Sequence, residues 1–304
     1  MSETGIKADW IAVDWGTSNL RCYAMSRSGT VLAQASSPKG MGQLAREDFE
    51  PALLELIGPW LAGPTDVIAC GMVGSRQGWV EAPYSTAPCP VLPDQVVMPP
   101  CDDPRLKVRV ISGVQQIKPN HDVMRGEETQ IAGFLSLNKD WDGVVCLPGT
   151  HTKWVHISAN EIISFRTFMT GEMFNLLSQN SVLKHSVGGA GWDDLAFAEG
   201  LELAMSRPET LAANLFSIRA ADLLTDQTPH QARAKLSGLL IGAELAASKP
   251  YWLGQNVCVL GADGLSKIYT DALQAQAVPV TQTDGTRMTL AGLTAAHAHV
   301  KETV

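Results

Sequence analysis

The segment Trp10-Ile-Ala-Val-Asp-Trp-Gly-Thr-Ser-Asn-Leu-Arg21 begins as an apolar run and stops at a turn of small residues. Residues 10–14 predict a buried strand, and the chain resumes as a second apolar run over residues 20–25. A third run, over residues 30–35, follows the Ser28-Gly29 turn. Short apolar runs joined by tight turns predict an antiparallel meander at the start of the chain.

Helices and further strands alternate after this meander. Apolar residues three and four positions apart predict a helix over residues 46–61, a short apolar run predicts a strand over 66–70, and a helix is predicted over 126–137. Residues 79–105 carry seven prolines and little periodicity, which predicts an ordered, extended segment with a functional role.

The second half of the chain opens on the same plan as the first. A strand predicted over residues 143–147 runs into the turn Pro148-Gly-Thr-His-Thr-Lys153, and a second strand follows over 154–157. A plan that recurs after about 130 residues suggests a duplicated α/β lobe. The other predicted elements are strands over 108–112, 162–168, 257–260 and 278–281, and helices over most of 172–250, over 265–276 and over 288–300.

Composition excludes several classes of protein. The chain has 304 residues, 45% of them hydrophobic and 18% charged, which suits folded lobes and excludes a disordered chain. The net charge of −8 gives no basic excess for nucleic acid, and no apolar stretch approaches a membrane span. The 6 cysteines are scattered without a C-x-x-C pair, and four of them are expected to be small buried residues: Cys22, Cys70, Cys146 and Cys258. We therefore expect a cytoplasmic protein with no nucleic-acid or membrane partner.

The two small-residue turns have the composition of phosphate-binding sites. A hairpin turn of Gly, Thr and Ser presents backbone N–H groups and hydroxyls toward one point, where phosphate oxygens are stabilised. Asp14 would then hold Mg²⁺, mainly through water. The alternative is a solvated hairpin in which Asp14 caps the turn. The G-x-x-x-x-G-K-[ST], G-x-G-x-x-G and protein-kinase motifs do not occur in the sequence.

Three segments resemble the nucleotide-binding loops of the sugar kinase, hexokinase, actin and Hsp70 superfamily. Asp14 to Arg21 is similar to the first phosphate loop, Pro148 to Lys153 to the second, and Val259-Leu-Gly-Ala-Asp-Gly264 to the adenosine loop. Over essentially the whole chain the sequence also resembles one family, the 2-dehydro-3-deoxygalactonokinases. The segments that carry this second resemblance are Gly71-Met-Val-Gly-Ser-Arg-Gln-Gly-Trp79, Glu81-Ala-Pro-Tyr84, Met124-Arg-Gly-Glu-Glu-Thr-Gln130 and Thr170-Gly-Glu172.

The resemblance implies a fold and an activity. The fold would be α/β, with two ribonuclease H-like (actin-like ATPase) lobes over residues 1–122 and 123–304, an interdomain cleft, and a last helix that packs on the N-terminal lobe. The reaction would be ATP-dependent phosphorylation of 2-dehydro-3-deoxy-D-galactonate at its 6-hydroxyl, with Mg²⁺. The resemblance is also compatible with a homodimer. The alternatives are a kinase for another sugar acid or sugar, and an ATP-driven conformational switch.

The resemblance also implies roles for particular residues. Glu127 matches the Asp that acts as the base in related kinases, one methylene longer, and Glu128 is the alternative; either could instead be a first-turn residue stabilised by the helix dipole. Arg76 would hold the carboxylate of the substrate by paired hydrogen bonds. The other substrate candidates are Gln77, Trp79, Tyr84 and Glu172, and the nucleotide candidates are Asp14 (also the metal ligand), Gly16, Thr17, Ser18, Arg21, Gly149, Thr150, Thr152, Lys153, Gly261, Ala262 and Gly264.

Overall fold

The computed structural model describes residues 5–92 and 95–303, and the chain divides into two compact units. Unit 1 contains the described residues up to Asp142, together with Ile157–Ser164 and the chain from Asp284 onward. Unit 2 contains Gly143–His156 and Phe165–Thr283. This division differs from the boundary expected at residues 122 and 123, because it places residues 123–142 in unit 1. Pro93 of the proline-rich segment lies outside the described residues.

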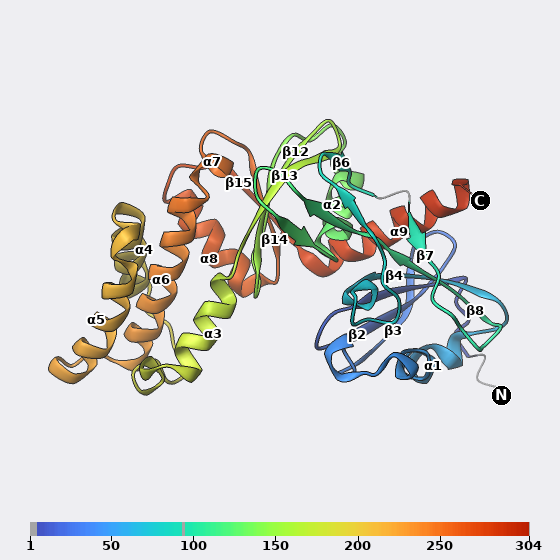
Figure 1. Ribbon diagram of the computed structural model, residues 1–304, viewed down its shortest axis with the longest axis horizontal. Coiled ribbons are helices and arrows are strands. Elements are labelled where there is room, and N and C mark those ends of the chain that lie inside the picture. The colour runs from blue at the N-terminus through green and yellow to red at the C-terminus, as the bar shows by residue number, and fades with distance from the viewer. Residues whose placement is uncertain (1–4, 93–94, 304) are drawn as a thin grey trace. The chain divides into compact units, whose positions relative to one another are not determined.

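A six-stranded sheet forms the centre of unit 1 (Figure 1). The antiparallel meander predicted at the start of the chain is confirmed, since the second strand pairs antiparallel with both the first and the third. The fourth strand pairs parallel with the first. From edge to edge the strands are β3 (Val31–Ser37), β2 (Leu20–Met25), β1 (Trp10–Trp15), β4 (Thr65–Gly71), β8 (Leu106–Ile111) and β7 (Val96–Val97).

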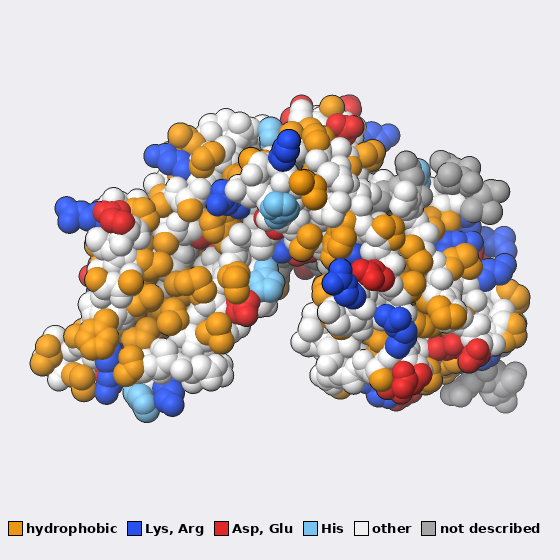
Figure 2. Space-filling model, in the orientation of Figure 1, with side chains coloured by type: hydrophobic (Ala, Val, Ile, Leu, Met, Phe, Trp, Pro, Cys, Tyr) orange, Lys and Arg blue, Asp and Glu red, His pale blue; other side chains and the backbone are white. Residues whose placement is uncertain are grey.

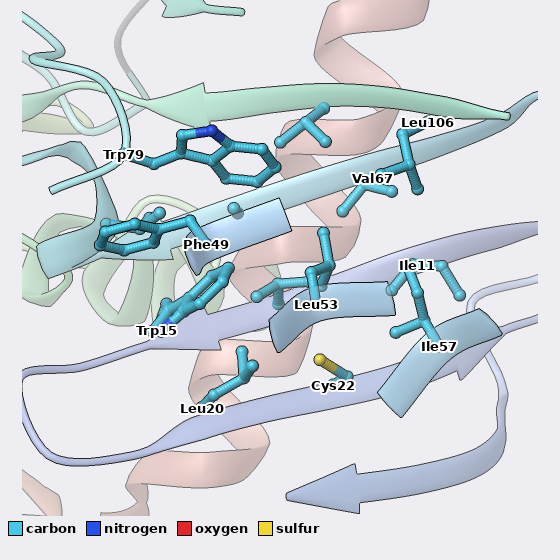
Figure 3. Packing of buried hydrophobic residues seen from close by; sticks show 14 of the residues in the cluster. Ile11, Trp15, Leu20, Cys22, Phe49, Leu53, Ile57, Val67, Trp79 and Leu106 are labelled. Carbon is cyan, nitrogen blue, oxygen red and sulfur yellow. The ribbon is translucent and has the colours of Figure 1, made fainter. Parts of the chain in front are cut away.

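Strand β1 is apolar almost throughout because both faces of its sheet are covered. Successive side chains of a strand point to opposite faces. Ile11 and its alternate neighbours pack with α1 (Phe49–Ile57), as Figure 3 shows. Trp10 packs in a second cluster that includes Leu293 of α9 (Gly285–Thr303). A helix on each face therefore explains why no polar residue interrupts the run before Asp14.

Helix α2 (Glu127–Leu137) packs against α9 at unusually short range. A Cβ atom built on Gly292 would lie 1.8 Å from the carbonyl oxygen of Thr129, and one built on Gly133 would lie 1.9 Å from that of Met288. Side chains at these positions would hold the helices apart, so the missing side chains allow the close approach. The N-terminus of α2 is thereby fixed to the body of unit 1.

Short strands and turns complete unit 1. The proline-rich segment supplies strands that the sequence analysis did not predict, and the predicted helix over residues 46–61 consists of α1 with a 3₁₀ turn at each end. The short strands are β5 (Tyr84–Thr86), β6 (Cys89–Pro90), β9 (Gly113–Gln116) and β10 (Asp122–Met124), and the 3₁₀ turns are η1 (Met41–Gln43), η2 (Arg46–Asp48), η3 (Gly58–Trp60) and η4 (Met72–Gly74).

The sheet of unit 2 repeats the strand order of unit 1. Three strands that follow one another in the sequence, β11 (Gly143–Leu147), β12 and β13, lie side by side. The next strand, β14 (Val257–Gly261), pairs parallel with β11. This shared order confirms the expected α/β fold with ribonuclease H-like units. From edge to edge the strands are β15 (Val280–Asp284), β14 (Val257–Gly261), β11 (Gly143–Leu147), β12 (Thr152–Ser158), β13 (Glu161–Phe168) and β6. Residues 157–164 belong to unit 1, and so does the pairing of β13 with β6.

Helices make up the rest of unit 2. Asp193 caps α4 (Asp194–Ser206) by accepting a hydrogen bond from the backbone N–H of Ala196. Thr228 and Gln231 form a capping box at the start of α6 (Pro229–Ala247). Figure 2 shows hydrophobic side chains over this part of the molecule, and those of α5 include the exposed Phe216. Within the described chain, no helix combines the length and apolar character needed to cross a bilayer. The helices are α3 (Thr170–Asn180), η5 (Val182–His185), α4 (Asp194–Ser206), η6 (Pro208–Thr210), α5 (Leu211–Leu224), α6 (Pro229–Ala247), α7 (Lys249–Trp252) and α8 (Asp263–Gln274).

Candidate active site

Three segments of unit 1 meet at the carboxyl ends of β1 and β4. The parallel register places Asp14 beside Cys70 and Trp15 beside Gly71. Gly126 precedes α2, and a Cβ atom on it would lie 3.3 Å from the Cα atom of Gly71. Both glycines have positive φ angles, +91° for Gly71 and +107° for Gly126, a backbone conformation that other residues adopt only with strain. Carboxyl ends of parallel strands are the usual ligand-binding edge of α/β sheets.

Asp14 stands at the end of β1 with a partly exposed carboxylate. Arg21, its register partner on β2, donates a hydrogen bond of 2.9 Å to Oδ2 of Asp14. The backbone N–H of Gly16 bonds the carbonyl oxygen of Asn19 at 2.9 Å and closes the turn, which leaves Thr17 and Ser18 exposed. The turn is therefore preformed and its hydroxyl groups are available to a ligand.

The donor set at Asp14 fits a magnesium ion held mostly by water and phosphate oxygens. Within residues 5–92 and 95–303 no three His, Cys, Asp or Glu side chains come together as a metal site. Mg²⁺ is usually held by only one or two carboxylates together with waters and phosphates, so the single carboxylate of Asp14 is sufficient. Asp14 thus remains the predicted metal ligand.

Glu127 and Glu128 occupy opposite situations at the start of α2. Glu127 is half-buried and accepts a 3.0 Å hydrogen bond from the backbone N–H of Arg125. Glu128 is 0% exposed, and its two carboxylate oxygens accept from the N–H of Gly126 at 2.9 and 2.7 Å. Burial, and after it the charge of Glu127, raise the pKa of Glu128 to about 7. Glu128 therefore caps the helix from inside, whereas Glu127 can meet a ligand.

The loop of residues 71–78, here called the Gly71 loop, presents two of the predicted substrate residues to solvent. Arg76 and Gln77 are exposed, and Nε of Arg76 lies 3.3 Å from Oε1 of Glu81. An exposed ion pair of this kind contributes at most about 1 kcal/mol, so a ligand carboxylate can compete with Glu81 for Arg76.

Trp79 requires a correction. The sequence analysis names Trp79 as a candidate for substrate binding, but its side chain is 3% exposed. Its ring stacks on Phe49 with centroids 6.2 Å apart and meets Trp15 edge-on, as Figure 3 shows. Trp79 belongs to the hydrophobic core beneath β1, so its side chain does not form part of the wall of a substrate pocket.

Tyr84 leads to a residue to which the sequence analysis gave no role. The guanidinium of Arg125 lies 4.3 Å from the centroid of the Tyr84 ring and donates a 2.8 Å hydrogen bond to the carbonyl oxygen of Ala82. Arg125 is 8% exposed, and its Nη1 would lie 2.9 Å from a Cβ atom on Gly74. Arg125 thus braces the Gly71 loop and the following segment against the start of α2. The sequence signal for a role of Arg125 was its position directly before Gly126 in the segment Met124 to Gln130, which carries the family resemblance.

Unit 2 carries the second turn at the carboxyl end of β11, held by the first turn of α3. A Cβ atom on Gly171 would lie 2.2 Å from the carbonyl oxygen of Gly149. The N–H of Glu172 donates a 2.9 Å hydrogen bond to the carbonyl oxygen of Thr150. Nε2 of His151 lies 2.6 Å from Oε2 of Glu172. Glu172 therefore contacts the turn itself, and its contact with a substrate stays a prediction.

Residues at the end of this turn are buried. Thr152 is fully buried with its hydroxyl 3.2 Å from that of Tyr269, so the direct ligand contact expected for this side chain does not fit its position. Lys153 is 4% exposed, and its role remains a prediction. The third loop lies beside the turn, since a Cβ atom on Gly261 would be 3.5 Å from the carbonyl oxygen of Pro148; Ala262 and Gly264 are exposed.

A cavity of about 480 Å³ opens beside this second turn, within unit 2. Its size falls within the usual range for small-molecule sites. Helical residues supply most of its surface, which is mainly apolar with a few polar groups. The sequence analysis named Gly149 and Thr150 and quoted the segment that begins at Thr170, but it missed the other helical residues, which come from three helices far apart in the sequence. The lining includes Gly149, Thr150, Thr170, Phe174, Asn175, Trp192, Arg233, Ser237, Leu240, Ile241, Leu265, Ile268 and Tyr269.

Two ribonuclease H-like units, each with a glycine-threonine turn after its first strand, define the class of actin-like ATPase folds, which includes carbohydrate kinases. The sequence matches the family model described as 2-keto-3-deoxy-galactonokinase over residues 14–296, and the chain belongs to that family. The resemblance found in the sequence is thereby confirmed.

Particular relatives agree with this membership. The chain is 36% identical over 299 residues to the 2-dehydro-3-deoxygalactonokinase of Escherichia coli (strain K12), covering 96% of this chain and 98% of the relative. It is similar, with a TM-score of 0.90 and 34% identity, to a crystal structure from Sinorhizobium meliloti that bears the same enzyme name, covering 96% and 99% of the two chains. A xylulose kinase from Lactobacillus acidophilus shares the fold alone, with a TM-score of 0.50 and 11% identity over 96% of this chain and 89% of that one.

Proposed function

We propose that the protein transfers the γ-phosphoryl group of ATP to the 6-hydroxyl of 2-dehydro-3-deoxy-D-galactonate, giving the 6-phosphate and ADP. The names of its relatives supply the substrate class. The observation that carries the proposal is the half-buried carboxylate of Glu127 at the start of α2. The residue before it, Gly126, lies against Gly71, and Gly71 pairs in register with Trp15, the residue after Asp14. This grouping supplies a base, an exposed cation and a metal ligand within one unit.

The chemistry assigns one role to each group. Glu127 accepts the proton of the 6-hydroxyl while the hydroxyl oxygen bonds to the γ-phosphorus and the bond from that phosphorus to the β–γ bridging oxygen breaks. ADP leaves with the electron pair of the broken bond. Asp14 would hold Mg²⁺, which when bound would neutralise the charge that develops on the phosphate oxygens. Arg76 binds the carboxylate of the sugar acid.

Each of the two glycine-threonine turns has the chemistry to bind phosphate oxygens. The backbone N–H groups of Thr17 and Ser18 in unit 1 suit phosphate oxygens, as do those of Gly149 and Thr150 in unit 2. The cavity of unit 2, with its apolar lining and a few polar side chains, has the size and chemistry for the adenosine part.

A substrate survey tests the proposal. ADP release would be followed with a coupled assay across 2-keto-3-deoxy acids, aldonates and free hexoses, and the phosphorylated position would be read by phosphorus–proton NMR. Activity on 2-dehydro-3-deoxy-D-galactonate with the phosphate on carbon 6 is expected. Activity on glucose without activity on the keto acid would contradict the substrate assignment, and ATP turnover that needs no sugar acid would contradict the kinase.

Arg76→Ala is expected to raise the KM for the sugar acid by about tenfold or more, because the charge-assisted pair with the substrate carboxylate is lost. The value of kcat should change little, since Arg76 is assigned to binding alone. Steady-state kinetics would measure both. Arg27→Ala is the matched control, because Arg27 is another exposed arginine of unit 1 that pairs with an aspartate, Asp9. An unchanged KM in Arg76→Ala would remove Arg76 from the substrate site.

Trp192 provides a direct probe of the nucleotide cavity. It lines the cavity and is 39% exposed, the most exposed tryptophan in the described chain. MgATP is expected to shield it from acrylamide, so the fluorescence of the wild-type protein should be quenched less when the nucleotide is present. Trp192→Phe should abolish this difference. A shielding effect of equal size in Trp192→Phe would place the nucleotide elsewhere.

A further inference from the structure

One carboxylate of unit 2, Glu244 on α6, lies inside the hydrophobic core behind the cavity. Its side chain is 2% exposed, and Cys146 of β11 lies near enough for the charge of Glu244 to affect the pKa of its thiol. A carboxylate in such surroundings is costly unless its oxygens accept hydrogen bonds. The sequence analysis gave Glu244 no role, and the reaction proposed above does not use it.

Neutral donors from three other elements converge on this carboxylate. The indole N–H of Trp154, on β12, donates to Oε1 at 2.8 Å. The hydroxyl of Tyr269, on α8, donates to Oε2 at 2.8 Å, and the hydroxyl of Thr170, at the start of α3, donates to the same oxygen. Glu244 thus joins β12, α3 and α8 through the hydrogen bonds of Trp154, Thr170 and Tyr269. Of these donors, Tyr269 also has the hydroxyl of Thr152 at 3.2 Å.

Two of these donors are themselves part of the cavity wall. Thr170 and Tyr269 both line the cavity, whereas Trp154 does not contribute to its lining. Thr170 is followed by Gly171, which packs directly on Gly149 of the second turn. The position of Thr170 therefore sets where the first turn of α3 holds that turn.

We infer that Glu244 is a positioning residue of the nucleotide site: it orients Thr170 and Tyr269, and through them the wall of the cavity and the second glycine-threonine turn. The inference rests on the proposed function, because it takes the ligand of this cavity to be a nucleoside triphosphate. Glu244 touches no ligand and acts only through its hydrogen-bonded neighbours.

Glu244→Met tests the inference, since methionine fills a similar volume but accepts no comparable hydrogen bond. We expect the Kd for MgATP, measured by titration calorimetry on the full chain, to rise by about tenfold, the usual cost of leaving buried hydroxyls without an acceptor. The KM for the sugar acid should stay within about twofold, because its site is assigned to unit 1. Glu244→Gln retains one oxygen and offers an N–H₂ to the two hydroxyl oxygens, so it should restore most of the affinity.

Controls separate positioning from general loosening of the core. Trp252→Phe removes a buried indole that packs in the same core and bonds the carbonyl oxygen of Leu245, away from the cavity. It should lower the melting temperature and leave the Kd for MgATP unchanged. Trp154→Phe removes one donor to Glu244 without altering the cavity lining, and should weaken MgATP binding by a smaller factor, which keeps the test available if Glu244→Met does not fold.

The outcomes are distinct. A Kd for MgATP within about twofold of wild type in both Glu244→Met and Trp154→Phe overturns the inference alone. An equal loss of affinity in Trp252→Phe also overturns it, because core loosening would then explain the effect. A wild-type protein that binds no MgATP overturns the proposed function and the inference with it.

Discussion

Glu127→Gln is expected to lower kcat by about 10²–10⁴-fold, the usual contribution of a positioned general base. Glutamine keeps the size of the side chain and can still accept the hydrogen bond from the backbone N–H of Arg125. The KM for either substrate should change little, since only the acceptance of the hydroxyl proton is lost. Steady-state kinetics at saturating ATP and sugar acid would measure the effect, with the melting temperature as a check on folding.

Glu128→Gln is the matched control, because it removes the neighbouring carboxylate that the structure buries. We expect kcat to fall by less than about tenfold, since Glu128 reaches no ligand and acts through the helix start. A loss of activity confined to Glu128→Gln, with near-normal kcat in Glu127→Gln, would move the base one residue along the chain.

The pH dependence of stability should distinguish these two carboxylates further. The pKa of Glu128, about 7 in the folded chain, lies above its ordinary value of 4.5. The folded state therefore holds this proton more tightly than the unfolded state does. The resulting contribution to the free energy of unfolding is fully present below about pH 4.5 and is lost as the pH rises to about 7. Chemical denaturation between pH 5 and pH 8 should show a smaller dependence in Glu128→Gln than in wild type, and an unchanged dependence would contradict the burial of this carboxylate.

The sequence contained enough information to predict the sheets and their loops. An uninterrupted apolar run such as Trp10 to Val13 is typical of a strand covered on both faces, and a turn of Gly, Thr and Ser after it has the composition of an anion-binding site. The same pattern repeats before Pro148. Local pattern was therefore sufficient for the elements and for the glycine-threonine turns.

The orientation of individual side chains could not be read in the same way. Glu127 and Glu128 are adjacent acidic residues in one first turn, and the sequence does not show that Glu128 is the one that points into the core. Trp79 follows a glycine-rich loop and looks like a pocket residue until Trp15 and Phe49 are seen to surround it. The orientation of these side chains depends on contacts between residues distant in sequence, and the periodicity of a single segment contains no information about such contacts.

The cavity of unit 2 shows the same limit on a larger scale. Its wall combines Thr170 of α3, Ser237 of α6 and Tyr269 of α8, which are separated by dozens of residues. Each helix alone shows only an ordinary mixture of apolar and polar residues. The carboxylate of Glu244, which joins two of these helices, likewise appears in the sequence as one acidic residue in a helix.

Gly292→Ala is expected to destabilise the protein by at least about 3 kcal/mol, although alanine normally favours a helix. The new Cβ atom would lie 1.8 Å from the carbonyl oxygen of Thr129, which is backbone and has no freedom to rotate away. Helices α2 and α9 would have to separate. Because α2 begins at Glu127, the separation would displace the carboxylate that we propose as the base, and kcat should fall in whatever fraction remains folded. Urea denaturation and steady-state kinetics would measure the two effects.

Gly58→Ala provides the comparison, because the same substitution is made where there is space. Gly58 has φ −50° and ψ −40°, a helical conformation, and a Cβ atom on it would meet nothing within 4 Å. Gly58→Ala should be neutral or stabilise the protein by up to about 1 kcal/mol, because alanine reduces the conformational entropy of the unfolded chain. If Gly292→Ala and Gly58→Ala unfolded at the same urea concentration, α2 and α9 would not be in the contact described, and the fixed position of Glu127 that the proposed mechanism requires would lose its support.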